Sequence, residues 1–137
     1  METIGEISQT QKMLAEFSWI SVSDKVHAEE HCLEVQLPFL QETLGEFKLL
    51  PLVVGDAKTE LLAALIQQFS EDHETLIVIS TDLSHFHDYQ TAREIDARTA
   101  NAIEYLEQNR ISKEDACGAY PFRGALLAAF QNQWNVH

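Results

Sequence analysis

The chain has 137 residues, of which 45% are hydrophobic and 23% charged, as expected of one compact globular domain rather than a disordered segment. Its formal net charge is −13, with 22 acidic residues against nine lysines and arginines. A balance this negative repels phosphate groups, which argues against nucleic acid and anionic membranes as partners. No apolar run approaches the roughly 18 residues that span a bilayer.

The N-terminal stretch METIGEISQTQK is polar and acidic, and it lacks the basic start and apolar centre of a signal peptide. The two cysteines, Cys32 and Cys117, lie far apart and without CxxC spacing. This spacing disfavours both a disulfide framework and a zinc knuckle, and it suits a reducing compartment. We therefore expect a cytoplasmic, acidic domain.

Hydrophobic spacing predicts the elements in chain order. They are a helix over 7–17, an extended stretch over 17–22, a helix over 29–44, an apolar strand over 47–55, a helix over 57–69, a second apolar strand over 75–80, a long helix over 91–109, a turn over 118–121 and a last helix over 122–134. Pro38 is expected to kink or shorten the second helix, Gly45 to end it, and Asp56 to cap the third. Continuously apolar strands that alternate with helices predict an α/β fold with a mainly parallel sheet.

The stretch STDLSHFHD, residues 80–88, follows the second predicted strand. Ligands bind beyond the carboxyl ends of strands in open α/β sheets, so Asp82, Ser84, His85 and His87 are expected at the rim of a pocket. Imidazole and carboxylate groups suit Zn or Fe(II). Ser84 beside His85 suits a nucleophile with its base, although no GxSxG elbow is present. A polar loop that satisfies local backbone donors is the third interpretation, and the residues alone leave all three open.

Two further motifs carry less information. His27 and His31 stand four residues apart in HAEEHCLEVQLPF, but the residue after His27 is Ala28, so the glutamate of the zinc motif HExxH is missing. We expect His27 to be solvated and His31 to be a partly buried helical residue. PLVVGD, residues 51–56, contains neither GxxxxGK[ST] nor GxGxxG, which favours a turn with a helix cap over a phosphate loop.

Four segments in this order, EEHCLEVQLPFLQ, LPLVVGD, STDLSHFHDY and ACGAYPFRGALLAA, together resemble the Memo-like family. That family includes the mediator of cell motility in animals and the bacterial AmmeMemoRadiSam system protein B. The resemblance implies a fold similar to class III extradiol dioxygenases, an α/β/α sandwich with a pocket at the strand ends. The family's other metal-site histidines lie upstream of EEH, so residues 1–137 are identified as one partial, middle-to-C-terminal Memo-like domain.

The resemblance also implies a set of site residues. His31 matches the histidine at the acid/base position of the dioxygenases, and it is the implied catalytic residue. Ser84 matches a position where the animal protein has a cysteine in its metal-binding pocket. Glu30, Asp82, Ser84 and His85 are the implied pocket residues, with Ser84 and His85 as weak metal ligands. The implied cofactor is a divalent metal, Fe or Zn, or none in this chain.

These expectations leave three functions to compare. The first is a non-catalytic binding or regulatory module that holds a small molecule or a peptide. The alternative is a non-heme iron oxidoreductase of the extradiol dioxygenase-like superfamily, active only with the missing N-terminal half. The third is a hydrolase that uses Ser84 and His85. A partial sheet exposes an edge strand and an apolar face, so we expect a homo-oligomer or pairing with another chain.

Overall fold

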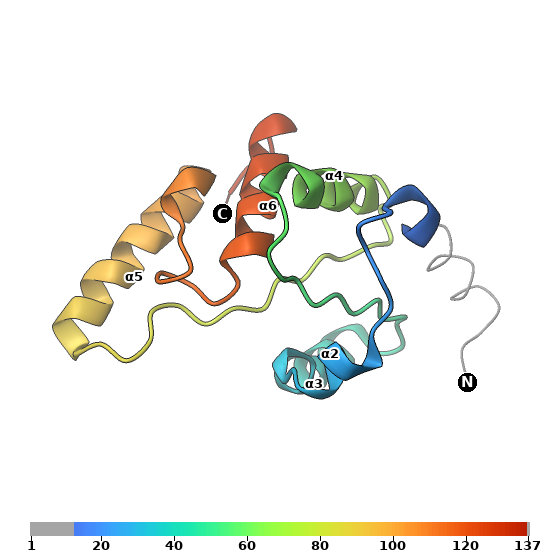
Figure 1. The fold of residues 1–137 in the computed structure, drawn as a ribbon, viewed down its shortest axis with the longest axis horizontal. Helices are drawn as coiled ribbons and strands as arrows, with labels where there is room; N and C mark the ends of the chain where they lie inside the picture. Colours follow the sequence, from blue (N-terminus) through green and yellow to red (C-terminus); the bar gives the residue numbers. More distant parts are fainter. Residues whose placement is uncertain (1–12, 137) are drawn as a thin grey trace. The chain divides into compact units, whose positions relative to one another are not determined.

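The computed structural model describes residues 13–136, and Figure 1 shows that the regular elements in this range are helices. The chain divides into two compact units, Met1–Val53 and Val54–His137. The single partial domain expected over 1–137 stays a prediction.

The first unit contains α2, Asp24–Ala28, and α3, Cys32–Leu44. The helix predicted over 29–44 is confirmed, but it begins later, and the unpredicted α2 precedes it. Ser23 caps α2, because its hydroxyl oxygen accepts a hydrogen bond from the Val26 N–H at 3.4 Å. Of the helix predicted over 7–17, residues 13–16 are helical, and the earlier part lies outside the described residues.

Pro38 and Gly45 act differently on α3. Pro38 lies inside the helix, which continues past it to Leu44, so the expected shortening is wrong. Gly45 ends the helix as expected, with a φ of 72° in the left-handed region that glycine adopts without steric penalty.

The second unit contains α4, Thr59–Ser70; α5, Tyr89–Glu104; the short 3₁₀ helix η1, Gln108–Arg110; and α6, Ala119–Gln131. All three α-helices were predicted, with shifted ends. The expected cap at Asp56 is wrong, because the N-cap of α4 is Lys58, whose side chain makes no capping bond. The end of α5 is also corrected, since the predicted last turn forms η1 instead.

Helices α4 and α6 pack directly against each other (Figure 1). Gly124 lies at this contact, and a Cβ placed on it would be 2.5 Å from Leu62 Cβ. Only the absence of a side chain at 124 allows α6 to approach α4 so closely. Around the start of α6, small and branched side chains form a buried core cluster, namely Ala102, Ile111, Ala116, Ala119 and Leu126.

The two predicted strands fall in segments without regular structure. Residues 47–55 and 75–80 lie outside helices, and neither forms a β-ladder with any residue in the range 13–136. A strand is stabilised by its neighbours, so an apolar run forms one only where another segment lies alongside it. The α/β sheet therefore stays a prediction.

Each unit has one tryptophan. Trp19 lies in the first, with its ring 6.0 Å from that of Phe17 in an edge-to-face arrangement. Trp134 lies in the second, just after α6, and its backbone N–H donates to the Ala129 carbonyl at 2.9 Å. Their exposed fractions are nearly equal, 37% and 38%. Among the described helices, none combines the length and apolar character that crossing a membrane requires.

Candidate functional site

The loop from Ser80 to Asp88 lies in the second unit and leads into α5. Leu83 packs against the buried core, which fixes the middle of the loop. On either side of it, His85 Nε2 lies 3.4 Å from Asp82 Oδ2. Both side chains are exposed, so the pair adds little stability, but the carboxylate orients the imidazole and favours one tautomer. That these two residues share one functional site stays a prediction.

Two residues of a second segment, Cys117 and Gly118, hold the start of this loop by hydrogen bonds. The Cys117 N–H donates to the Asp82 carbonyl at 3.2 Å, and the Asp82 N–H donates to Cys117 Sγ at 3.1 Å. The Gly118 N–H donates to Thr81 Oγ1 at 2.7 Å, and Thr81 Oγ1 lies 3.4 Å from Cys117 Sγ. The Cys117 thiol thus lies against the backbone of the residue that pairs with His85.

Cys117 is the residue beside the candidate site that sequence reasoning missed, because it was considered only for a disulfide framework or a zinc knuckle. It is 35 residues from Asp82 along the chain, and no periodicity joins the two. A signal was nevertheless present. The cysteine stands inside ACGAYPFRGALLAA, one of the four segments that carry the family resemblance. The thiol is exposed and free of any disulfide.

Ser84 faces a different environment from its neighbours. Its N–H donates to Asp96 Oδ1 on α5 at 3.0 Å, which ties the loop to the helix. Its Oγ is buried and makes no hydrogen bond to His85 or to any other described residue. The nucleophile-and-base pair that a hydrolase needs is therefore not formed.

Asp88 caps α5 instead of acting at a site. Its Oδ1 accepts hydrogen bonds from the N–H groups of Gln90 at 3.0 Å and Thr91 at 3.1 Å. Its Oδ2 accepts from Thr91 Oγ1 at 2.6 Å. The Thr91 hydroxyl and these backbone donors hold the pKa of Asp88 below its ordinary value. The loop thus has the capping role of the third interpretation at its end and the Asp82–His85 pair at its start.

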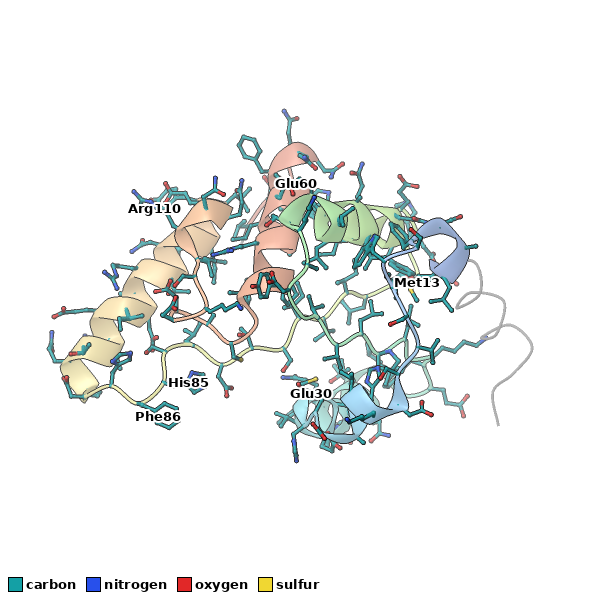
Figure 2. All side chains as sticks on the ribbon, viewed as in Figure 1. Met13, Glu30, Glu60, His85, Phe86 and Arg110 are labelled. Carbon is teal, nitrogen blue, oxygen red and sulfur yellow. The ribbon has the colours of Figure 1, made fainter. Side chains whose placement is uncertain are left out.

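Phe86 separates these two parts of the loop. Its φ is 60°, in the left-handed region that bulky residues avoid, and its side chain is fully exposed at 105%. Figure 2 shows Phe86 beside His85 on the chain leading into α5, and their ring centroids lie 5.9 Å apart.

Glu30 and His31 belong to the first unit, and their relation to the loop is left as a prediction. Glu30 Oε1 accepts hydrogen bonds from the N–H groups of His31 at 2.8 Å and Cys32 at 3.1 Å, at the start of α3. These two backbone bonds lower the pKa of Glu30. His31 is the N-cap residue of α3 and is exposed, so the expected partial burial is wrong. His27 ends up in α2, so the two histidines do not share a helix face.

The side-chain donors that lie close together can be compared with the set of ligands that the expected metal needs. Within residues 13–136, no three His, Cys, Asp or Glu side chains gather closely enough to hold an ion. The loop supplies the pair Asp82 and His85, while Ser84 offers a buried neutral hydroxyl. These side chains by themselves do not fit a Zn or Fe(II) site, which takes at least three protein ligands. The Fe or Zn cofactor stays a prediction.

With this geometry established, comparison with known proteins places the chain. The family model described as "Memo-like protein" matches residues 5–122. The chain belongs to the Memo-like family. A MEMO1 family protein of Methanobrevibacter smithii is 34% identical over 107 residues, which cover 74% of this chain and 38% of that protein. One of Aquifex aeolicus is 32% identical over 115 residues, covering 81% of this chain and 42% of the relative.

This Memo-like chain therefore spans only part of the length of its relatives. A MEMO1 family protein of Aeropyrum pernix is 29% identical over 141 residues. This match covers 91% of this chain but only 50% of the relative. No solved structure matches the chain. The family model matches residues 5–122. This range contains the loop with Asp82 and His85, and it contains Cys117, which is hydrogen-bonded to that loop.

Proposed function

We propose that this Memo-like chain is a binding or regulatory module whose ligand contacts the His85–Asp82 pair and the neighbouring Cys117 thiol, without turnover in this form. One observation carries the proposal. Two segments 35 residues apart are hydrogen-bonded together, so that the Cys117 thiol lies against the backbone of Asp82, whose carboxylate lies 3.4 Å from the His85 imidazole at the surface. Such a convergence of polar groups is what binding sites use to orient a ligand.

The proposal also includes an α/β/α fold and a cytoplasmic location for the chain. Residues 47–55 and 75–80 would be strands of a partial α/β/α sandwich, which is supported by their apolar, β-branched sequence and by the predicted alternation with helices. A cytoplasmic location is supported by the two cysteines, both of which are free thiols.

The ligand is tested by NMR on the full chain with a panel of small hydroxy and carboxy compounds. These present the donors and acceptors that the pair can meet. We expect shifts of the His85 ring signals and of the backbone amides of residues 81–85 and 117, with the His87 ring as the internal control. Equal shifts at His85 and His87, or none at either, would overturn the proposed site.

The second candidate is the metal-dependent oxidoreductase, which is favoured by the carboxylate that orients the exposed His85 imidazole for proton transfer. Metal content of the chain, purified under reducing and anaerobic conditions, separates the two functions. The module predicts far less than one Fe or Zn per chain, unchanged in His31→Ala, His85→Ala and Cys117→Ser. One metal per chain that is lost in His85→Ala and retained in the control His87→Ala would favour the oxidoreductase instead.

A further inference from the structure

An open cleft of about 790 Å³ lies where the end of α5 meets η1 and the turn over 113–115. Two of the nine lysine and arginine side chains of the molecule, Arg98 and Arg110, line this cleft. Arg98 comes from α5 and Arg110 from the last position of η1, which Figure 2 shows near the end of α5. The chain as a whole repels anions, so two guanidinium groups in one cleft indicate a local site for an anionic ligand.

The walls of the cleft are held by the folded core. After α5 the chain reverses at Leu106, whose φ of 55° is left-handed and whose side chain packs against the core cluster. The Glu107 backbone N–H then donates to the Ala102 carbonyl at 2.8 Å, and the Arg110 backbone N–H donates to the Glu107 carbonyl at 2.9 Å. Thr99, which also lines the cleft, is only 3% exposed. A cleft that is shaped before its ligand arrives loses less conformational entropy on binding.

The Arg98 guanidinium keeps its hydrogen-bond donors available. Within residues 13–136, no residue forms an ion pair with it or accepts a hydrogen bond from it. The neighbouring Asp115 does not use these donors, because its Oδ2 accepts from the Ser112 N–H at 2.8 Å and from the Ser112 hydroxyl at 2.6 Å. The Ser112 hydroxyl chiefly lowers the pKa of Asp115, and the charge of Arg98 contributes to the same shift. Arg98 can therefore bind a carboxylate with its planar fork without breaking a bond inside the chain.

Arg110 is oriented by an acidic neighbour. Its Nη1 lies 3.0 Å from Glu107 Oε2, which fixes one edge of the guanidinium group. The Arg110 side chain is still 72% exposed, and a guanidinium has five N–H donors, so the others can reach a ligand. The exposed pair contributes little to stability, and its rearrangement on binding costs correspondingly little. Tyr105 adds a phenol group to the same cleft.

We propose that this cleft binds a small dicarboxylate, with one carboxylate at Arg98 and the other at Arg110. A dicarboxylate spreads two negative charges over two groups. A phosphate dianion concentrates them on one, where the Glu107 and Asp115 carboxylates that line the same cleft repel it more strongly. No residue of the loop 80–88 lines the cleft, so the proposal does not rest on the ligand chemistry of His85.

The test titrates the isotope-labelled full chain with sodium succinate and follows the arginine Nε–H signals by NMR. We expect the Arg98 and Arg110 signals to shift, together with the backbone amides of residues 105–110. Arg93 is the internal control, because it lies on the same helix but outside the cleft, 5.7 Å above the centre of the Tyr89 ring. Sodium chloride at equal ionic strength accounts for screening. The His85 ring reports on the other site in the same titration, so failure of one proposal is distinguishable from failure of the other.

Two matched variants locate the contact, since Arg98→Gln and Arg93→Gln each remove one guanidinium group from an exposed position of α5. Read from the Arg110 signal, the succinate dissociation constant is expected to rise at least about tenfold in Arg98→Gln and to change by less than about twofold in Arg93→Gln. Arg98→Lys keeps the charge without the fork and is expected to fall between them. Circular dichroism checks that the variants fold.

Four outcomes overturn the proposal. They are absence of a shift at Arg98 and Arg110, equal shifts at Arg93 and Arg98, shifts that sodium chloride reproduces, and equal weakening by the two glutamine variants. Inorganic phosphate is the comparison ligand, and binding of phosphate more tightly than succinate also overturns the assignment of a dicarboxylate.

Discussion

At the level of single residues, Phe86 adopts a conformation that its side chain makes costly. A left-handed φ of 60° places the Cβ close to the following carbonyl, at a cost of about 1 kcal/mol for a non-glycine residue. The side chain is fully exposed and gains no burial in return. Uncompensated strain beside a candidate site is typical of positions kept for function rather than for stability.

Phe86→Gly is therefore expected to be more stable than Phe86→Ala by about 1 kcal/mol in urea unfolding, because only glycine adopts the left-handed region freely. The comparison with alanine removes the effect of losing the aromatic ring. An alanine variant as stable as the glycine variant would show that the left-handed conformation is not retained in solution.

Asp88 links the stability of the second unit to pH. Its pKa is lowered in the folded state, chiefly by the Thr91 hydroxyl. A lowered folded-state pKa means that the stabilisation is fully present above the pKa of the unfolded chain, near 4 by ordinary values, and is lost as the pH falls through the lower folded value.

We expect Asp88→Ala to unfold at a lower temperature than the wild type at pH 7 and the difference to shrink below about pH 4. Asp88→Asn is the matched control, since it keeps an oxygen that accepts from the backbone but does not titrate. It is expected to stay close to the wild type at pH 7. Thermal unfolding followed by circular dichroism measures both, and a pH-independent difference for Asp88→Ala would contradict the assignment.

At the level of elements, the contact between α4 and α6 depends on Gly124. A methyl group there would lie 2.5 Å from Leu62 Cβ, an atom that cannot rotate away. Gly124→Ala is expected to lower the free energy of unfolding by about 2 kcal/mol, the cost of overpacking a buried contact.

Gly55→Ala is the matched control for this substitution. Its added Cβ would meet no atom within 4 Å, so the variant is expected to be neutral or slightly stabilising. Denaturant unfolding at pH 7 compares the two variants directly. Equal effects at positions 55 and 124 would mean that the helices do not approach as closely in solution.

The helices were predictable because their signals are local. The apolar stripe of α4, which buries Leu62, Ala63 and Leu65, is readable from spacing alone. The ends were less predictable: Lys58 occupies the N-cap position of α4 without a side-chain capping bond, although Asp56 has the better capping chemistry. The strands over 47–55 and 75–80 were identified by composition, but a strand also needs a partner, and no local pattern can supply one.

The site was predictable in the same limited way. Asp82 and His85 are three residues apart, so their pairing follows from local sequence. The contact of Cys117 with Asp82 depends on how the chain folds back over 35 residues, and hydrophobic periodicity does not predict such a contact. The resemblance contained the cysteine within its fourth segment without assigning it a place in the site.

At the level of the whole molecule, a net charge of −13 over 137 residues destabilises the folded state through repulsion. Salt screens charges over about 10 Å at 0.1 M. We expect the melting temperature at pH 7 to rise as NaCl is raised from about 0.01 M to about 0.3 M. The control is the same series near the isoelectric pH of about 4.7, where the rise should disappear. A melting temperature at pH 7 that falls with salt would contradict the prediction.

The placement of the two tryptophans gives each unit its own optical reporter. Trp134→Phe leaves Trp19 to follow the unit Met1–Val53, and Trp19→Phe leaves Trp134 to follow Val54–His137. Both residues are partly buried, so the fluorescence of each is expected to change when its unit unfolds. Coincident midpoints in denaturant would show that the units melt as one cooperative body, and separate midpoints would give each unit its own stability without any added label.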